Sequence, residues 1–227
     1  LDCETVFGRR APLVLEIGFG MGEATAAMAL ADPSRDVLAI DVHLAGAGSL
    51  LREIALLGLT NVRVIIGDAL PVLRDLLLPD SLDEIRAFFP DPWPKSRHHK
   101  RRLIGPRFAA LTGMRLRTGG RLHCATDWAP YAEQMLDVVQ GEPSLINPYG
   151  GYVRRPPQTP PLQTPPGDCS LTPSSDLPQM PLWRPVTLFE RQGLAKGHAV
   201  FDVVAHRVAE GPQTGPRDAC GECQAGR

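Results

Sequence analysis

A stretch of sixteen residues combines a carboxylate, an indole and a run of cationic side chains. Residues 88–103 read Phe-Phe-Pro-Asp-Pro-Trp-Pro-Lys-Ser-Arg-His-His-Lys-Arg-Arg-Leu. Each of the three prolines fixes its own φ and disfavours helix at the residue before it, so the stretch predicts an extended, rigid loop that presents Asp91 and Trp93. A carboxylate held in this way is suited to stabilise positive charge in a bound ligand.

The second half of this stretch is strongly basic. Between Lys95 and Arg107 the chain has six Lys or Arg residues, two His residues and no acidic residue. A charge run is most often a solvated helix face. This run directly follows the rigid loop, and Arg and Lys side chains bind phosphate oxygens, so we favour a nucleic acid as its partner. Because the formal net charge of the chain is only -1, such a contact must be local.

A second candidate site lies at a glycine turn near the start of the chain. Residues 13–23 read Leu-Val-Leu-Glu-Ile-Gly-Phe-Gly-Met-Gly-Glu, and an Ala-rich stretch follows at 24–31. This order predicts the strand, turn and helix of a nucleotide-binding unit. The third glycine is Gly22, so the spacing departs from the dinucleotide pattern Gly-x-Gly-x-x-Gly. With Glu16 before it, the turn resembles motif I of S-adenosylmethionine-dependent methyltransferases, although Glu16 could instead only cap the next turn.

Two further acids follow apolar segments. Asp41 ends the segment 36–42, about 20 residues after the glycine turn, where a carboxylate can accept hydrogen bonds from both ribose hydroxyls of an adenosine. Asp68 follows the segment 62–66. In the methyltransferase fold the acid after the third strand lies beside the adenine, but Asp68 could equally cap the helix that ends near Leu77.

These residues need a scaffold that brings the ends of several strands together. Strand-like segments at 13–17, 36–42, 62–66, 83–89 and 121–128 alternate with helical segments at 24–31, 47–57, 102–117 and 131–139. We predict a doubly wound, Rossmann-like α/β fold with a mostly parallel seven-stranded sheet. At its edge, residues 187–190 and 199–207 should pair as an antiparallel C-terminal hairpin.

The length predicts one domain over residues 1–210, because 227 residues suffice for one substantial core, and the resemblance of its glycine turn implies a methyltransferase domain. Residues 156–185 hold ten of the 23 prolines, so we expect a flexible insertion at about 153–183. We expect a disordered tail at 211–227, in which Cys220 and Cys223 lack the second pair that a zinc site needs. His123 and Cys124 are expected to be packing residues.

The chain shows no signal peptide and no apolar stretch long enough to cross a bilayer, so we expect a soluble, cytoplasmic protein with no membrane partner. Its five scattered cysteines do not form a disulfide framework. Leu1 in place of Met suggests that the true N-terminus is missing or was removed. We expect a monomer or homodimer without a metal.

Together these motifs resemble the bacterial tRNA (guanine-N7-)-methyltransferases. The similar strings are 16–22, 89–95, 99–102, Ala-Thr-Asp-Trp at 125–128, and Arg-Pro-Val-Thr-Leu-Phe-Glu at 184–190 followed by Gly197-His198. The proline loop and the basic run are the specific part, whereas the glycine turn is generic. The resemblance implies methylation of guanine N7 in tRNA, at guanosine 46 of the variable loop, with S-adenosylmethionine as cofactor and tRNA as partner.

By position, the resemblance assigns roles to three groups of residues. The cofactor group is Glu16, Gly18, Gly20, Gly22, Asp41, Asp68 and Asp91, and Asp91 is also the catalytic residue. The guanine nucleotide falls to Lys95, Asp127, Thr187, Phe189 and Glu190. The tRNA falls to Arg97, His98, His99, Lys100, Arg101 and Arg102.

The chain also departs from the family pattern. Asp41 replaces the usual Glu, and Leu188 stands where the family has Lys, which removes a charge contact to the substrate. The family usually has more sequence ahead of the glycine turn. Two other interpretations remain open. A methyltransferase for another RNA, a protein or a small molecule would explain the glycine turn, and a noncatalytic RNA-binding module would explain only the basic run.

Overall fold

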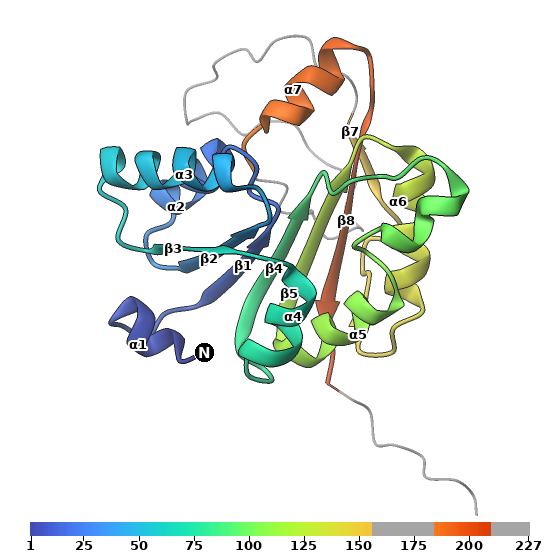
Figure 1. The fold of residues 1–227 in the computed structure, drawn as a ribbon. Coiled ribbons are helices and arrows are strands. Elements are labelled where there is room, and N and C mark those ends of the chain that lie inside the picture. Colours follow the sequence, from blue (N-terminus) through green and yellow to red (C-terminus); the bar gives the residue numbers. More distant parts are fainter. Residues whose placement is uncertain (156–183, 210–227) are drawn as a thin grey trace, which may run out of the picture.

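The computed structural model of the chain describes residues 1–155 and 184–209, which form a twisted central sheet with helices on both faces (Figure 1). The strands are β1 Leu13–Ile17, β2 Asp36–Asp41, β3 Val62–Ile66, β4 Leu82–Phe88, β5 Leu116–Thr126, β6 Leu145–Ile146, β7 Val153–Arg155 and β8 Val200–Arg207. The helices are α1 Cys3–Phe7, α2 Glu23–Ala31, α3 Leu44–Leu57, α4 Ala69–Pro71 with the π-turn η1 Val72–Leu76, the 3-10 helix η2 Ser96–Arg101, α5 Pro106–Arg115, α6 Ala129–Gln140 and α7 Leu188–Ala195.

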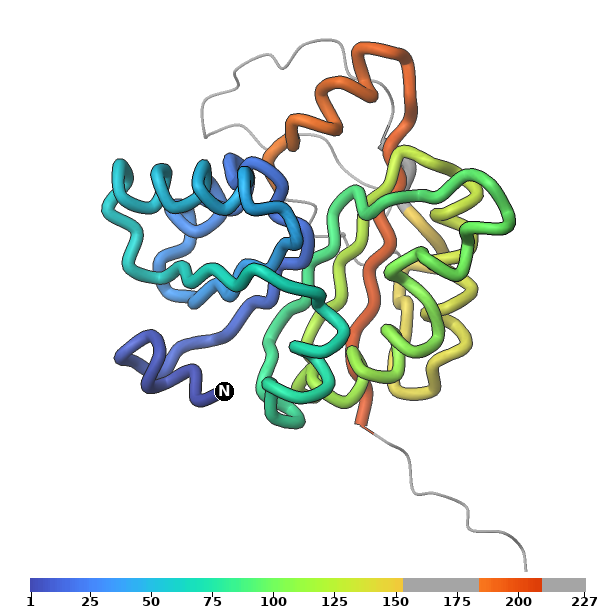
Figure 2. Tube along the Cα trace, viewed as in Figure 1, coloured from blue at the N-terminus to red at the C-terminus, as the bar shows by residue number. Residues whose placement is uncertain are grey.

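The order of the sheet is β3-β2-β1-β4-β5-β8-β6, with the short β7 also paired to β8. Strands β1 to β5 run parallel, and β8 runs antiparallel to β5, β6 and β7. Figure 2 shows the red β8 beside the yellow-green β5, so the C-terminal part of the described chain completes the sheet. The predicted mostly parallel Rossmann-like sheet is confirmed. The strand order reverses between β1 and β4, which is where such folds bind ligands, beyond the carboxyl ends of the strands.

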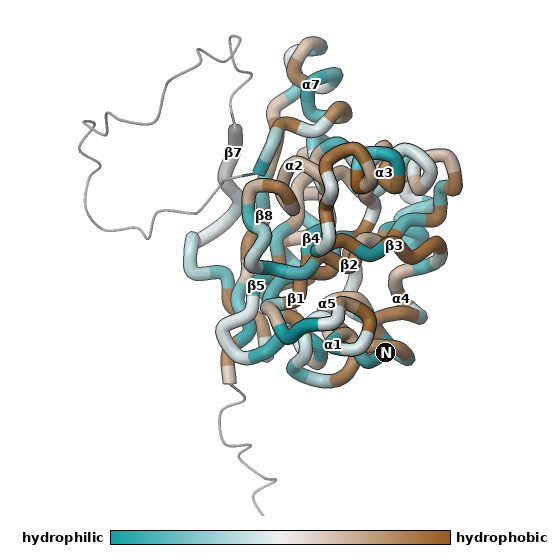
Figure 3. The backbone as a smooth tube through the Cα atoms, turned by 90° about the vertical axis from the view of Figure 1, so that its left-hand side faces the viewer, coloured by the Kyte–Doolittle hydropathy of each residue, from teal (hydrophilic) through white to brown (hydrophobic). Residues whose placement is uncertain are grey.

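The two faces of the sheet carry separate apolar cores. Alternate residues of β1 and β2, such as Leu15 and Leu38, face a core with Leu73, Phe108 and Tyr131 from η1, α5 and α6. The intervening residues pack with α2 and α3 on the other face. The sequence of β2 is apolar between its two terminal aspartates, as expected for a strand buried on both faces. The edge strand β3 is only partly buried, and Figure 3 shows it mostly in the brown of hydrophobic residues. No helix of residues 1–155 or 184–209 is long and apolar enough to cross a membrane.

The expected C-terminal hairpin is wrong in its first strand. Residues 188–195 form helix α7, and the antiparallel partners of β8 besides β5 are β6 and β7. Thr187 caps the helix, because its hydroxyl accepts a hydrogen bond from the amide of Glu190 at 3.1 Å. Thr-x-x-Glu is the capping-box signature, and this local preference outweighs the short β-like run.

Two other boundaries also differ from the expectation. Val153–Arg155, expected to belong to the insertion, form β7 and pair with β8. Residues 156–183, the rest of the expected insertion, and the expected tail at 211–227 lie outside the described residues. The helix expected at 102–117 is shorter, because α5 begins at Pro106, a residue favoured in the first turn of a helix.

Candidate active site

A pocket of about 260 Å³ lies at the carboxyl ends of β1 and β4. It brings together four segments that are distant in sequence: the glycine turn at 16–24, residues 41–43 after β2, the start of the proline loop at 88–91, and the N-terminal turn of α7 at 187–189. Figure 1 shows α7 above this edge of the sheet. The structure therefore unites the two candidate sites that the sequence separates by about seventy residues.

The glycine turn adopts a conformation that only glycine accepts easily. Gly18, Gly20 and Gly22 have φ values of 81°, 56° and 85°, in the left-handed region. A Cβ on Gly22 would also lie 2.6 Å from the Cβ of Leu50, because α3 packs closely on the turn. These backbone positions leave room for a ligand at the start of α2.

Glu16 is the strongest indication of a cationic ligand. Its side chain is buried, and burial raises the pKa of the carboxyl group. Oε1 accepts a hydrogen bond from the Thr25 hydroxyl at 3.0 Å, whereas Oε2 is buried without a hydrogen-bond partner. A buried carboxylate oxygen without a donor is costly, and a cationic amino group would satisfy it. The pocket therefore fits the methionine end of S-adenosylmethionine.

Asp41 connects the end of β2 to the glycine turn. Its Oδ2 accepts from the amide of Gly20 at 2.9 Å, and Oδ1 accepts from the amide of His43 at 3.0 Å. An ionised carboxylate has about four lone-pair sites, so acceptor capacity remains for the two hydroxyls of a ribose. Asp68 lies elsewhere: it is exposed, it is not among the residues that line the pocket, and its side chain caps α4 by accepting from the Leu70 amide at 2.9 Å.

The proline loop holds Asp91 at the pocket by several contacts. The Phe89 amide donates to the carbonyl oxygen of Ala125 at 2.8 Å, and the Arg102 Nε donates to the carbonyl oxygen of Pro92 at 2.7 Å. Phe89 and Trp93 have φ values of 53° and 40°, so the expected extended backbone is wrong at these two positions. Such strained conformations persist only where the surroundings hold them, and they flank the proposed catalytic carboxylate.

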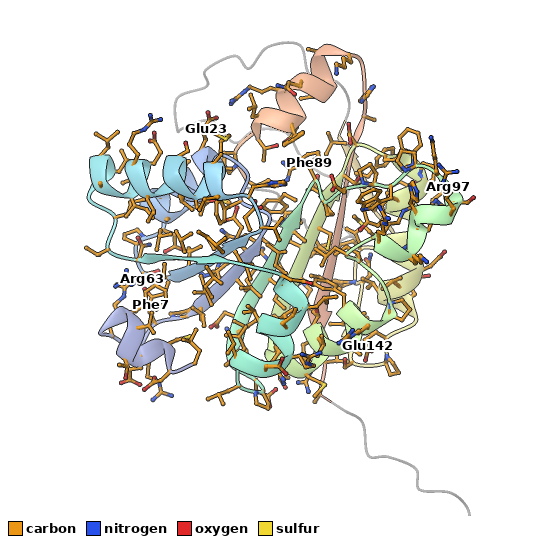
Figure 4. All side chains as sticks on the ribbon, in the orientation of Figure 1. Phe7, Glu23, Arg63, Phe89, Arg97 and Glu142 are labelled. Atoms are coloured by element: carbon orange, nitrogen blue, oxygen red, sulfur yellow. The ribbon has the colours of Figure 1, made fainter. Side chains whose placement is uncertain are left out.

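The basic run forms the 3-10 helix η2, whose cationic residues take two different roles. Arg97, His99, Lys100 and Arg101 are exposed, and Figure 4 shows Arg97 pointing outward. His98 is half-buried and packs edge-on against Trp93, and the Arg101 guanidinium lies 5.0 Å from the Trp93 ring centre.

Arg102 departs from the expected RNA contact. Its side chain is buried over the Tyr131 ring, and besides the Pro92 carbonyl it donates to Gln134 Oε1 at 2.5 Å. It is oriented inward because η2 ends there and the chain turns towards α5. Its role in the structure is to hold the proline loop against α6.

A buried charge network that the sequence did not indicate lies behind the pocket. Arg184 pairs with Glu190 and, at 2.9 Å, with Asp202, which also accepts from His123 at 2.8 Å. Burial opposes ionisation of Asp202, but hydrogen bonds from His123 and Arg184 outweigh it and lower the pKa to about 2. The Arg184 guanidinium also lies 5.3 and 5.4 Å from the ring centres of Phe88 and Phe89.

This network places the substrate residues predicted in α7. Glu190 is buried with 1% of its surface exposed, so its carboxylate faces Arg184 rather than the pocket. Thr187 and Phe189 line the pocket, and Phe189 is exposed. Asp127 follows the end of β5 and lies against the C-terminal part of α7. Lys95 is exposed and directly precedes η2. Neither residue lines the pocket. His123, expected to be a packing residue, is instead a hydrogen-bond partner in a buried charge network.

The sheet order and the glycine turn at its switch point define a Rossmann-like α/β fold with a ligand site beyond the carboxyl ends of its strands. Solved structures with the same fold include the 16S rRNA methyltransferase KamB, with a TM-score of 0.60 at 14% identity over 92% of this chain and 93% of that one. An antibiotic related methyltransferase gives a TM-score of 0.57 at 14% identity over 90% and 92%. A family model described as "Putative methyltransferase" matches residues 10–151.

The chain belongs to the tRNA (guanine-N(7)-)-methyltransferase family. It is 52% identical, over 92% of its length, to the protein of that name from Streptomyces avermitilis, and 48% identical over 92% to the one from Paraburkholderia xenovorans. The chain spans 64% of the first relative and 71% of the second.

Proposed function

We propose that this chain transfers a methyl group from S-adenosylmethionine to N7 of a guanine in tRNA, and that the target is guanosine 46 of the variable loop. The proposal is based on the pocket, which is lined by both Glu16, whose Oε2 has no hydrogen-bond partner, and Asp91 of the proline loop. Exposed basic residues follow directly after this loop. The names of its relatives support tRNA as the substrate, and hence the bacterial cytoplasm as the location.

The residues of the pocket divide the work of binding. Glu16 holds the cationic amino group, Asp41 accepts from the ribose hydroxyls, and the glycine turn lets the backbone approach the ligand. When bound, the cofactor supplies a methyl group on a positively charged sulfur. The family resemblance assigns Asp68 to the adenine. Asp68 does not line the pocket, so this assignment requires the adenine to extend beyond the pocket towards α4.

The chemistry makes few demands on the protein. Guanine N7 has an in-plane lone pair and no proton, so no general base is required, and the chain must align the base and exclude water. Positive charge moves to the base as the methyl group is transferred. Asp91, held between strained residues at the pocket, stabilises that charge, and Lys95, Asp127 and the first turn of α7 hold the nucleotide.

The direct test is mass spectrometry of tRNA after incubation with the chain and the cofactor. We expect 7-methylguanosine at position 46 and none in a tRNA that has adenosine at this position. Methylation of a small molecule or of another RNA, with tRNA unmodified, would contradict the proposal. Absence of cofactor binding by calorimetry would favour a noncatalytic RNA-binding module.

We expect Asp41→Asn to raise the cofactor dissociation constant about tenfold, because the amide loses acceptor capacity at the ribose and one hydrogen bond to the glycine turn. The affinity for tRNA should change less than twofold, since η2 is untouched. Calorimetry measures the first quantity and filter binding the second. The exposed Asp137→Asn is the matched control, and an equal loss of both affinities would contradict the assignment of Asp41.

Asp68→Asn tests the remaining assignment in the same assay. Asn caps helices as well as Asp does, so α4 should remain intact. A higher cofactor dissociation constant at an unchanged melting temperature supports the adenine contact. An unchanged constant would leave Asp68 with the capping role alone.

Replacing Arg97, Lys100 and Arg101 together by Ala should weaken tRNA binding and lower its salt dependence. Each phosphate contact contributes roughly 0.7 to 0.9 to the slope of log affinity against log salt, so three contacts predict a decrease of about 2 to 3. Arg102 is left intact because it holds the proline loop. The control is a triple variant at Arg10, Arg52 and Arg74, which removes the same charge from exposed sites elsewhere. Equal slopes for both variants would exclude η2 as the RNA contact.

A further inference from the structure

His198 contacts Asp127, the residue that the proposed function assigns to the guanine. Its Nδ1 lies 3.1 Å from Oδ2 of Asp127, and both side chains are partly exposed, at 49% and 34%. His198 follows α7, whereas Asp127 follows β5, so the contact joins two distant parts of the chain. The pair lies at the carboxyl edge of the sheet, where the proline loop also begins.

The end of α7 fixes where the imidazole lies. The amide of His198 donates to the carbonyl oxygen of Gly193 at 3.0 Å, and the amide of Gly197 donates to that of Leu194 at 2.9 Å. With Gly197 at φ 78°, these two bonds form a Schellman motif, which ends a helix in a defined geometry. The backbone position of His198, from which its imidazole projects, is thus set by the end of the helix.

Gly193 lets the carboxylate of Asp127 lie against α7. A Cβ at Gly193 would lie 3.3 Å from Oδ2 of Asp127, which is closer than an ordinary van der Waals contact. It would lie 3.8 Å from Cβ of His198. The Asp127 carboxylate is therefore bounded by α7 on one side and held by the imidazole at Oδ2. Its remaining lone pairs are available to a ligand.

We propose that His198 is a positioning residue, which orients the Asp127 carboxylate so that it accepts hydrogen bonds from N1–H and the 2-amino group of the target guanine. The proposal rests on the proposed function. Two donors on the Watson–Crick edge of guanine match the two oxygens of a carboxylate, and enzymes that act on an unstacked base read this edge. Without the imidazole, the half-exposed carboxylate can rotate about its terminal torsion, which has a broad energy well.

The same helix serves the cofactor pocket. The first turn of α7 lines that pocket, and His198 follows the C-terminal end of the helix. Arg191 in the middle of the helix pairs with Glu23 of α2 at 2.9 Å. Glu23 is labelled beside this helix in Figure 4. A positioning role for His198 thus predicts an effect on base recognition without an effect on cofactor affinity.

The test compares three substitutions at His198 with tRNA transcripts that carry either guanosine or inosine at the target position, since inosine lacks the 2-amino group. His198→Asn keeps a nitrogen donor bonded directly to Cγ, which is the position of Nδ1 in histidine. His198→Gln moves the donor one bond further, and His198→Ala removes it. We expect His198→Ala to raise KM for guanosine tRNA about tenfold, the loss of one hydrogen bond to a charged group, with kcat changed less than threefold.

Three readouts separate this role from a structural one. The preference for guanosine over inosine should fall about tenfold in His198→Ala and stay within about twofold of the wild type in His198→Asn, with cofactor affinity unchanged in both. His198→Gln should resemble His198→Ala. In an Asp127→Ala background, His198→Ala should cause no further loss.

Each contrary outcome has a defined meaning. If Asp127→Ala reduces the guanosine preference and His198→Ala does not, the inference is overturned and the proposed function stands. If His198→Ala lowers the melting temperature and kcat and His198→Asn does not restore them, His198 only ends the helix, and the inference is overturned. If Asp127→Ala leaves KM and the preference unchanged, the guanine site assigned in the proposed function is wrong, and the inference falls with it.

Discussion

Asp91→Asn is expected to lower the maximal methylation rate about 10²-fold or more while binding of cofactor and tRNA survives. The substitution keeps the size of the side chain but removes the charge that faces the pocket. Deletion of one preorganised electrostatic group typically costs 10²- to 10³-fold in rate, or about 3 to 4 kcal/mol. Because the proposed phosphate contacts lie on η2, which the substitution leaves unchanged, the tRNA dissociation constant should change little.

Single-turnover rates at saturating cofactor and tRNA measure this effect without a contribution from binding. Asp127→Asn is the matched control, since it removes the same charge from the site proposed for the base, and it should act mainly on KM. A near-normal single-turnover rate for Asp91→Asn would place the catalytic centre elsewhere. The proline loop would then have no assigned function.

Arg184→Met is expected to destabilise the fold by about 3 to 5 kcal/mol, the range for removing one partner of a buried ion pair. Asp202 and Glu190 both lose the guanidinium, and neither side chain is exposed to water. For a domain of this size the loss corresponds to roughly 6 to 20 °C in melting temperature. Denaturant unfolding gives the free energy, and Arg191→Met is the control because its partner Glu23 is exposed, so at most about 1 kcal/mol is expected.

The effect of Arg184→Met should depend on pH. The pKa of Asp202 is lowered to about 2 in the folded protein from an ordinary value of 3.8. A lowered pKa stabilises the fold above the unfolded-state pKa, and this stabilisation is lost as pH falls through the folded-state value. The difference between wild type and Arg184→Met should be complete above about pH 5 and should shrink as pH falls towards 2. A difference that is constant over this range would mean that packing on Phe88 and Phe89 accounts for the loss.

The prediction of the fold from sequence succeeded where the signal was local and repeated. Five strand-like segments that alternate with helical ones were enough to predict the parallel part of the sheet, because this alternation is typical of α/β folds with a parallel sheet. Prediction failed at residues 187–190, whose short apolar pattern is compatible with a strand. There the capping of α7 by Thr187 decided the outcome.

The candidate residues of the site could be recognised from local sequence. The glycine turn, Asp41 and the proline loop can each be read from a short stretch of sequence. Because ligands bind beyond the carboxyl ends of parallel strands in such folds, all three are expected at the same edge of the sheet. Which of these charged side chains are buried and which remain available to a ligand depends on the packing of the folded chain. Arg102 and Glu190 turn inward, Glu16 keeps an unsatisfied oxygen, and His198 reaches Asp127 across 71 residues. Burial and pairing depend on which elements pack together, and such long-range contacts have no periodic pattern in the sequence from which they could be predicted.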